Sequence, residues 1–235
     1  MKEPRSIGIV IPTLNEVERL PFLLDYLLSI DSAIPLEVVV VDGGSTDGSF
    51  ELSKTYKEVV FIRSEKAGRS VQLNLGAARS SADILLFLHA DCTPPPHFPR
   101  WMLETIRNGS DFGYFSYRFD EKKHRLLTLN EKGTGKKNLF TGGGDQGLFV
   151  KRDVFEKVGG YDDTLPIMED FDLHKRLKKN YRYEIVDKPA LVSARKYHNN
   201  GYWRVQWVNL IVFVGFKCGL SPKRLASFYQ KNLSN

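Results

Sequence analysis

Four acidic residues fall at the ends of expected strands or at the start of an expected helix: Glu16, Asp42, Asp91 and Asp170. Three of them follow strands that should lie parallel, so their side chains gather on one rim of a sheet. Carboxylates crowded on one rim repel each other unless a cation or hydrogen-bond donors compensate their charge. A divalent metal ion bound together with a nucleotide would supply that compensation, and this is the chemistry that the four residues indicate.

The most informative segment is VVVVDGGSTDGS, residues 38–49. Four successive valines ended by turn residues are typical of a strand buried on both faces, as in parallel α/β sheets. Asp42 then lies at the carboxyl end of that strand, where open α/β sheets bind ligands. Gly43, Gly44 and Gly48 allow the backbone to approach a ligand, because glycine has no Cβ atom. The segment therefore predicts a cleft with a carboxylate in it.

The elements that would position these residues alternate through the first half of the chain. Strands are predicted over 6–12, 36–42, 59–64 and 82–91, and helices over 15–30, 47–57, 69–80 and 97–108. This order implies a parallel sheet with right-handed crossovers, and therefore an α/β fold.

The second half, beyond about residue 110, is less regular. Strands are predicted over 112–119, 147–152, 181–187 and 190–194, the first of them antiparallel, and helices over 168–180, 201–216 and 221–232. Residues 120–144 form a long polar, glycine-rich loop, which in a compact domain is usually functional or mobile. Neither a repeat nor a low-complexity linker interrupts the sequence, so we expect one domain over 1–235.

Composition narrows the possible partners and location. The net charge of +6 favours an anionic partner, and the sequence has no dense Lys/Arg stripe of the kind found in nucleic-acid modules. Two cysteines, Cys92 and Cys218, stand far apart in unlike contexts, which predicts a reducing, cytoplasmic location. No signal peptide precedes the strand at Ser6, and the longest apolar stretch, 207–220, falls short of a membrane span.

Five motifs in order resemble those of family-2 glycosyltransferases with the GT-A fold, a mostly parallel, Rossmann-like sheet with a smaller antiparallel part. They are PTLNE (12–16), VVDGGSTDGS (40–49), GR (68–69), LHAD (88–91) and MED (168–170). The resemblance covers about residues 5–195. A finer pattern, GGGDQGLFVKRDVFEKVGGY, PIMEDFDL and VSARKY, is similar to the subgroup called selenodomain-associated transferase 2.

The resemblance implies an inverting, hexosyltransferase-type transfer of a sugar from a nucleoside diphosphate sugar to an acceptor hydroxyl. It further implies a nucleotide-binding half over 1–110, an acceptor half over 111–200 and two C-terminal helices over 201–235. Asp170 would be the general base, with Glu169 as its rival for that role.

Under the same resemblance, the donor nucleotide would be bound by residues that share the predicted rim: Pro12, Thr13, Glu16, Asp42, Gly44, Arg69, His89 and Asp91. Asp42 would accept hydrogen bonds from the base or ribose, and Arg69 would approach the base or diphosphate. Asp145, Gln146 and Arg195 would face the donor sugar or the acceptor. Asp42, Asp91 and Asp170 also have a purely structural interpretation, since each of them could cap a loop or a helix.

The expected metal site departs from the family pattern. Asp91 would bind a divalent metal, Mn²⁺ or Mg²⁺, but His89 replaces the usual first aspartate of the Asp-x-Asp motif and Cys92 replaces a further acid. His198 is a candidate for an extra ligand. Mg²⁺ commonly uses one or two carboxylates plus substrate phosphates, so Asp91 can suffice. SARKY (193–197) replaces the Gln-x-x-Arg-Trp motif of processive synthases, which predicts non-processive transfer.

Two other functions remain open at this stage. A sugar-phosphate nucleotidyltransferase shares a similar sheet, although the loop PTLNEVERL (12–20) lacks the glycine-rich sequence of that class. A non-catalytic nucleotide-sugar binding protein would fit the incomplete acidic triplet LHADC (88–92).

The predicted C-terminal helices, 201–232, also have two interpretations. In the first, Trp203, Trp207, Phe213 and Phe216 pack within the protein. In the second, the helices dock on the inner face of the cell membrane, which would suit a lipid-linked acceptor, because Trp and basic residues favour anionic interfaces.

Overall fold

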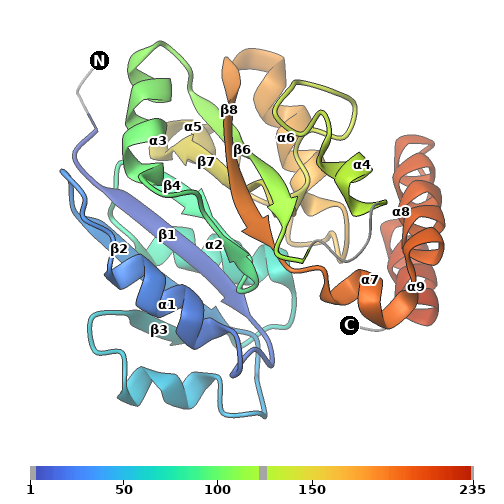
Figure 1. The fold of residues 1–235 in the computed structure, drawn as a ribbon, viewed down its shortest axis with the longest axis horizontal. Coiled ribbons are helices and arrows are strands. Elements are labelled where there is room, and N and C mark those ends of the chain that lie inside the picture. Colours follow the sequence, from blue (N-terminus) through green and yellow to red (C-terminus); the bar gives the residue numbers. More distant parts are fainter. Residues whose placement is uncertain (1–3, 122–125, 234–235) are drawn as a thin grey trace.

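The computed structural model describes residues 4–121 and 126–233, built around one sheet of order β3-β2-β1-β4-β7-β6-β8-β5 (Figure 1). The strands are β1 Ile7–Thr13, β2 Leu36–Asp42, β3 Val60–Arg63, β4 Ile84–Phe87, β5 Cys92–Thr93, β6 Phe112–Phe119, β7 Leu148–Lys151 and β8 Tyr183–Val192. The α-helices are α1 Leu20–Leu28, α2 Arg69–Arg79, α3 Phe98–Arg107, α4 Leu127–Glu131, α5 Arg152–Lys157, α6 Glu169–Asn180, α7 Arg195–Asn200, α8 Tyr202–Lys217 and α9 Pro222–Asn232. Two short 3₁₀ helices, η1 Phe50–Lys54 and η2 Gly144–Gln146, complete the set. The α/β prediction is confirmed.

The first four strands of the order, β3, β2, β1 and β4, are all parallel, as predicted. Thr13 pairs with Asp42, so the β1 and β2 strands end side by side at one rim. Beyond β4 the sheet is mixed, because β7 is antiparallel to both β4 and β6. The prediction that residues 112–119 form an antiparallel strand holds only at Phe112 and Gly113, since the whole of β6 is parallel to β8.

Both faces of the sheet are covered, which explains the run of valines in β2. Val38 and Val40 belong to a core shared with α1 and α3, while Val41 faces α2 on the other side. All four valines are buried. The close approach of α2 to the sheet depends on Gly76, whose position leaves no room for a side chain.

Gly76→Ala is expected to destabilise the fold. A Cβ atom at residue 76 would lie 2.3 Å from Val10 Cγ1 and 3.1 Å from Val41 Cγ2. Overpacking of this kind costs about 1–3 kcal/mol, more than the roughly 1 kcal/mol that alanine gains over glycine in a helix. Urea unfolding should show a lower midpoint for Gly76→Ala, whereas Ala78→Ser on the exposed side of α2 should leave it nearly unchanged. An unchanged midpoint for Gly76→Ala would contradict the packing.

Two predicted helices of the first half differ from the structure. The helix expected over 15–30 begins only at Leu20, with Pro21 in its first turn. Residues 15–17 are held instead by side chains of the 45–49 loop, which compete with helical hydrogen bonds. The helix expected over 47–57 is replaced by the shorter 3₁₀ helix η1.

The second half differs at other points. The strands expected over 181–187 and 190–194 form one strand, β8, with a register shift opposite Phe115 and Ser116, next to Pro189. Proline cannot donate a ladder hydrogen bond, which explains an irregularity there. The loop expected over 120–144 contains α4 and the start of η2, apart from 122–125, which lie outside the described residues. Helices α5 and α7 were not predicted.

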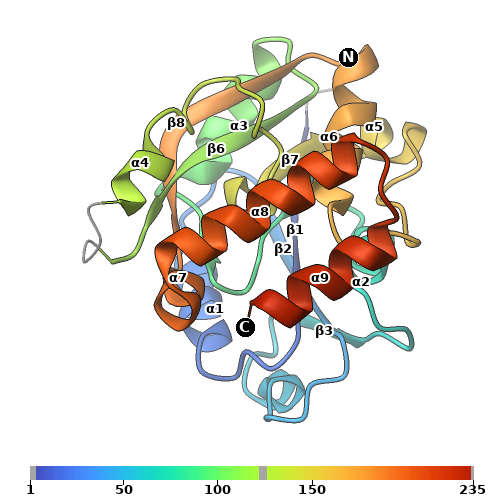
Figure 2. The same cartoon turned by 90° about the vertical axis from the view of Figure 1, so that its right-hand side faces the viewer.

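The two C-terminal helices form a separate layer that packs on residues 167–171 (Figure 2). Phe213 is buried there, but Trp203 and Trp207 are exposed, so the prediction that these tryptophans pack inside is wrong. Over the described ranges 4–121 and 126–233, none of the helices combines the length and apolar character that crossing a membrane requires.

Candidate active site

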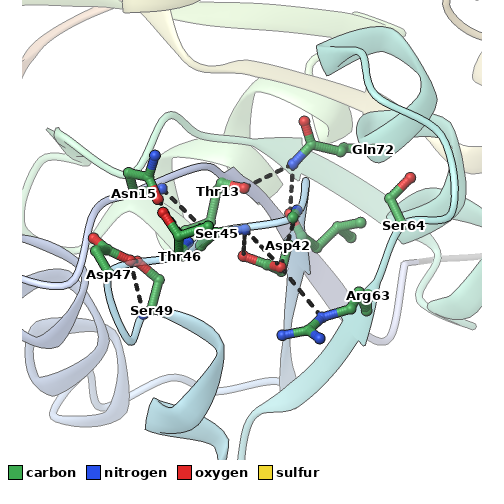
Figure 3. Close-up of polar contacts among 12 residues, drawn as sticks. Thr13, Asn15, Asp42, Ser45, Thr46, Asp47, Ser49, Arg63, Ser64 and Gln72 are labelled. Carbon is green, nitrogen blue, oxygen red and sulfur yellow. Dashed lines mark hydrogen bonds and ion pairs between the residues drawn. The ribbon is translucent and has the colours of Figure 1, made fainter.

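Two loops at the carboxyl ends of β1 and β2 are tied together by side-chain hydrogen bonds (Figure 3). Asn15 has a positive φ of 55°, and its backbone N–H donates to Ser45 Oγ at 2.9 Å. The Asn15 carboxamide oxygen accepts in return from the backbone N–H of Thr46 at 2.9 Å. Ser49 Oγ also accepts from the backbone N–H of Glu16 at 2.9 Å. These bonds fix the rim on which Glu16 and Asp42 lie.

Asp42 is almost fully buried and organises the loop that follows it. Its carboxylate accepts hydrogen bonds from the backbone N–H groups of Gly44 (3.0 Å) and Ser45 (3.1 Å). Arg63 Nε lies 3.6 Å from Asp42 Oδ2 (Figure 3). Gly44 has a φ of 97°, a conformation that favours glycine. The loop-capping interpretation is thus realised, and contact of Asp42 with a base or ribose stays a prediction.

A buried amide that the sequence did not single out supports the same rim. The Nε2 atom of Gln72 donates hydrogen bonds to the backbone carbonyl oxygens of Thr13 (2.9 Å) and Val41 (2.7 Å). Gln72 therefore joins α2 to the ends of β1 and β2. The hydroxyl of Thr13 is buried and has no hydrogen-bond partner among the described residues. Thr13 and its neighbour Pro12 were both predicted to line the nucleoside pocket.

Arg69 brings three distant segments together. From the first residue of α2, its Nε donates to Glu169 Oε1 and its Nη2 donates to Asp170 Oδ2 at 3.2 Å, both on the first turn of α6. Its Nη1 lies 3.3 Å from His89 Nε2, just beyond β4. Four residues predicted for the site therefore form one cluster, although about 100 residues separate Arg69 from Asp170 in the chain.

Within this cluster, the two candidates for the general base, Glu169 and Asp170, differ in how exposed their side chains are. The Glu169 side chain is 2% exposed, whereas that of Asp170 is 13% exposed. Asp170 also lines a hollow of about 10 Å³ with His89 and the glycines 142–144, room for roughly one water molecule. A Cβ atom on Gly144 would lie 2.8 Å from Asp170 Oδ2 and 2.5 Å from His89 Nε2, so glycine is needed at this wall.

Burial shifts the protonation of this cluster. Desolvation raises the pKa of Asp170 to about 7; Arg69 opposes the shift, while the carboxylates of Glu169 and Asp145 add to it. Desolvation, together with the charge of Arg69, lowers the pKa of His89 to about 4. His89 is therefore neutral at pH 7, and Asp170 is poised between its two protonation states, as a general base requires.

Asp91 lies in a second group of charges on the same rim. Its pKa is raised, first by burial and then by the carboxylates of Asp145 and Glu16, against the opposing effects of His89 and Arg195. A cation would relieve this repulsion, so the donor set fits a hard divalent metal. Within the part of the chain that the structure describes, however, no three His, Cys, Asp or Glu side chains form a complete metal-binding group.

The residues predicted to face the sugar or the acceptor differ in whether their polar groups are free to contact a ligand or already bonded within the protein. Arg195 Nη2 donates to Glu16 Oε1 at 2.8 Å, which links α7 to the nucleotide-binding rim. Gln146 is buried and uses its amide within the protein, accepting from Gly142 N and donating to Thr134 O. Asp145 is exposed, so it is the most accessible of the three.

His198 was predicted to be an extra metal ligand. It lies on α7, and its Nε2 is 3.2 Å from Glu121 Oε2. That nitrogen is thus directed at a carboxylate, and a metal-binding role for His198 stays a prediction.

Comparison with known proteins identifies the family. The model of the family described as "Glycosyl transferase family 2" matches residues 8–158. The chain belongs to glycosyl transferase family 2. This match includes β1, apart from Ile7, and continues through β7, so that it contains Asp42, Arg69 and Asp91. The finer resemblance to the selenodomain-associated subgroup is not confirmed.

Curated relatives extend the match. The succinoglycan biosynthesis protein ExoA of Rhizobium meliloti is 29% identical over 208 residues, which are 78% of this chain and 62% of ExoA. The dolichol-phosphate mannosyltransferase of Pyrococcus furiosus is 33% identical over 45% of this chain and 31% of its own length. This family-2 chain thus spans less than two thirds of these relatives.

Solved structures confirm the fold as GT-A. S. aureus TarS 1-349, in complex with UDP-GlcNAc, has a TM-score of 0.67 and 16% identity, covering 96% of this chain and 71% of the TarS chain. The mannosyltransferase PcManGT from Pyrobaculum calidifontis, in complex with GDP-Man and Mn²⁺, has a TM-score of 0.61 and 19% identity, covering 99% and 74%. At such identities the likeness concerns the fold alone.

Proposed function

We propose that this family-2 member transfers a sugar from a nucleoside diphosphate sugar to an acceptor hydroxyl, with inversion and one sugar at a time. The observation that carries the proposal is the position of Asp170, in a hollow beside Arg69 and His89, where burial raises the pKa of its carboxyl group to about 7. A base with this pKa is matched to deprotonating a hydroxyl near neutral pH.

The other residues have complementary roles in this proposal. The tied loops after β1 and β2 bind the nucleoside, with Thr13 and Asp42 as the polar groups at their base. Arg69 holds a positive charge next to the base and is placed to approach the leaving diphosphate, whose charge must be stabilised as the glycosidic bond breaks. Glu169, buried against Arg69, orients that guanidinium instead of acting as the base.

Asp91 would hold a divalent metal ion, with Asp145 as the most accessible carboxylate near it. Such an ion, Mn²⁺ or Mg²⁺, stabilises charge on a leaving diphosphate. The Mn²⁺ in the PcManGT complex supports this choice. The division into a nucleotide-binding half, 1–110, and an acceptor half, 111–200, is part of the same proposal.

The acceptor that we propose is lipid-linked, with the enzyme acting in the cytoplasm at the inner face of the membrane. Two of the relatives support this by name, the dolichol-phosphate mannosyltransferase and an undecaprenyl-phosphate 4-deoxy-4-formamido-L-arabinose transferase of Pectobacterium carotovorum. The second is 31% identical over 46% of this chain.

Donor binding should stabilise the protein only when metal is present. We expect a thermal-shift screen of UDP, GDP, CDP and their sugars, with and without Mn²⁺, to reveal one responding nucleotide. At a hundredfold excess over its Kd, that ligand adds about 2.7 kcal/mol to the free energy of unfolding. Asp91→Ala should lose the response. Glu58→Ala, exposed before β3 at the opposite rim, should keep it.

Other outcomes would favour other functions. No response to any nucleotide diphosphate or its sugar, from a folded protein, would contradict the proposal. A response to nucleoside triphosphates together with a sugar phosphate, and release of pyrophosphate, would favour the nucleotidyltransferase. A metal-dependent response without any transfer to added acceptors, and without an effect of Asp170→Asn on any activity, would favour a non-catalytic binding protein.

A further inference from the structure

Helix α8 has two apolar faces, and only one of them is covered. Val205, Val208, Val212 and Phe213 pack against α9 and residues 167–171. On the opposite side lies the outer face of α8, which we define by its exposed apolar residues: Trp203, Trp207, Leu210, Ile211 and Val214. Trp203 and Trp207 are 66% and 63% exposed.

The spacing of these residues makes them a continuous stripe. Positions 203, 207, 211 and 214, and likewise 207, 210 and 214, are three or four residues apart, which places all five on one side of a helix. Phe140 is exposed too, but its ring lies 5.1 Å from that of Phe213 on the covered face, so Phe140 is not part of this stripe. Contiguous exposed apolar surface of this kind marks an interaction site.

The segment that carries this stripe has charged side chains of one sign only. Residues 195–235 contain seven of the chain's 34 basic residues and none of its 28 acidic residues, which leaves 27 basic and 28 acidic residues in the remainder. The entire positive net charge therefore comes from the C-terminal segment. Arg204 and Lys217 stand near the two ends of α8, and the exposed residues Lys223, Arg224 and Lys231 lie on α9.

We propose that the outer face of α8 docks on an anionic lipid bilayer, with the helix lying in the plane of the interface. Tryptophan is enriched at the membrane interface, and basic residues are attracted to anionic lipid head groups. With 16 residues, α8 is about 24 Å long, shorter than the roughly 30 Å of the hydrocarbon core, so it lies on the bilayer and does not cross it. A protein partner would need acidic groups to match this segment, whereas an anionic bilayer matches both its charge and its apolar stripe.

Docking would also orient the candidate active site. The covered face of α8 packs on the start of α6, where the rings of Phe213 and Phe171 are 5.3 Å apart, and Phe171 directly follows Asp170. Figure 2 shows α8 and α9 side by side across this part of the molecule. The bilayer would thus lie one helix layer away from Asp170. The use of this arrangement for a lipid-linked acceptor rests on the proposed function, but the docking itself does not.

Vesicle flotation tests the docking. The protein should float with vesicles of equal parts phosphatidylcholine and phosphatidylglycerol, and much less with phosphatidylcholine alone. The double variant Trp203→Ser/Trp207→Ser should weaken binding by at least about tenfold, because it removes the interfacial anchors. Lys223→Gln/Arg224→Gln should weaken it too, more strongly at low salt.

Matched controls distinguish this surface from general stickiness. Phe22→Ser removes an aromatic side chain that is 78% exposed on α1, and Lys178→Gln/Lys179→Gln removes two exposed charges on α6. Both should bind vesicles like the parent. All the substituted side chains are exposed, so melting temperatures should stay close to that of the parent.

Trp101→Phe provides an independent readout, because Trp203 and Trp207 are then the only tryptophans, and their emission can be excited separately from that of the ten tyrosines. Brominated lipids in anionic vesicles should quench their emission.

Absence of flotation and quenching, or equal binding to neutral vesicles, would overturn the proposal. So would a dimer in light scattering that the Trp203→Ser/Trp207→Ser variant dissociates, since a second copy would then be the occupant. If the protein bound vesicles but transferred no sugar, only the proposed function would be contradicted, and the docking proposal would stand.

Discussion

Asp170→Asn is expected to lower kcat by about 10²–10⁴-fold, the usual contribution of a positioned general base. Asparagine has nearly the same shape but cannot accept the acceptor's proton. The metal-dependent thermal shift with the donor should persist, because Asp170 is assigned to the acceptor hydroxyl. Turnover should be measured with the nucleotide sugar that the thermal-shift screen selects, by release of the nucleoside diphosphate.

Asp172→Asn is the matched control. Asp172 lies one residue beyond Phe171 in α6 and pairs with Arg176 at 2.7 Å, away from the cluster. It should keep nearly full turnover.

Glu169→Gln tests Glu169, the rival candidate for the general base. This substitution should change donor affinity through Arg69 more than it changes the chemical step. If Glu169→Gln abolished turnover while Asp170→Asn kept it, the assignment of the base would be wrong.

The pH profile of kcat/KM should rise through about pH 7 and then level off. Asp170 must be ionised to act as a base, and its pKa in the folded protein is raised to about 7, chiefly by burial. Below that pH the ionised fraction falls about tenfold per unit, and kcat/KM should fall with it, since this parameter reports the free enzyme. The residual activity of Asp170→Asn should lack this step.

The same shift has a consequence for stability. A carboxyl group whose pKa is raised from 3.8 to about 7 on folding binds its proton more tightly in the folded state. Its contribution to stability is therefore lost as the pH rises from about 4 through 7. Asp170→Asn removes this loss. The melting temperature of the variant minus that of the parent should therefore be larger at about pH 9 than at about pH 5. An unchanged difference across this range would contradict the raised pKa.

Much of the fold was predictable because its signals are local. The apolar run ending at Asp42 specified β2 at its observed bounds, since a strand buried on both faces needs apolar side chains throughout. Helix α6 was predicted over 168–180 and is found at Glu169–Asn180, because its acidic start and basic end suit the helix dipole. The start of α1 was missed because the bonds that hold residues 15–17 come from Ser45, Asp47 and Ser49.

The sequence by itself determined the α/β class, the family motifs and the set of acidic residues on one rim, because periodicity and short motifs are local properties. The resemblance already favoured Asp170 over Glu169 as the base, and the tertiary structure adds the physical reason for that preference. Arg69 contacts both acids, but the side chain of Glu169 is buried and that of Asp170 is partly exposed. The pKa of Asp170 depends on its burial and on charges from α2, α6 and η2, which only the folded chain brings together. Only the tertiary structure decided that Trp203 and Trp207 face outward, because the packing partners of α8 cover only one of two equally apolar faces.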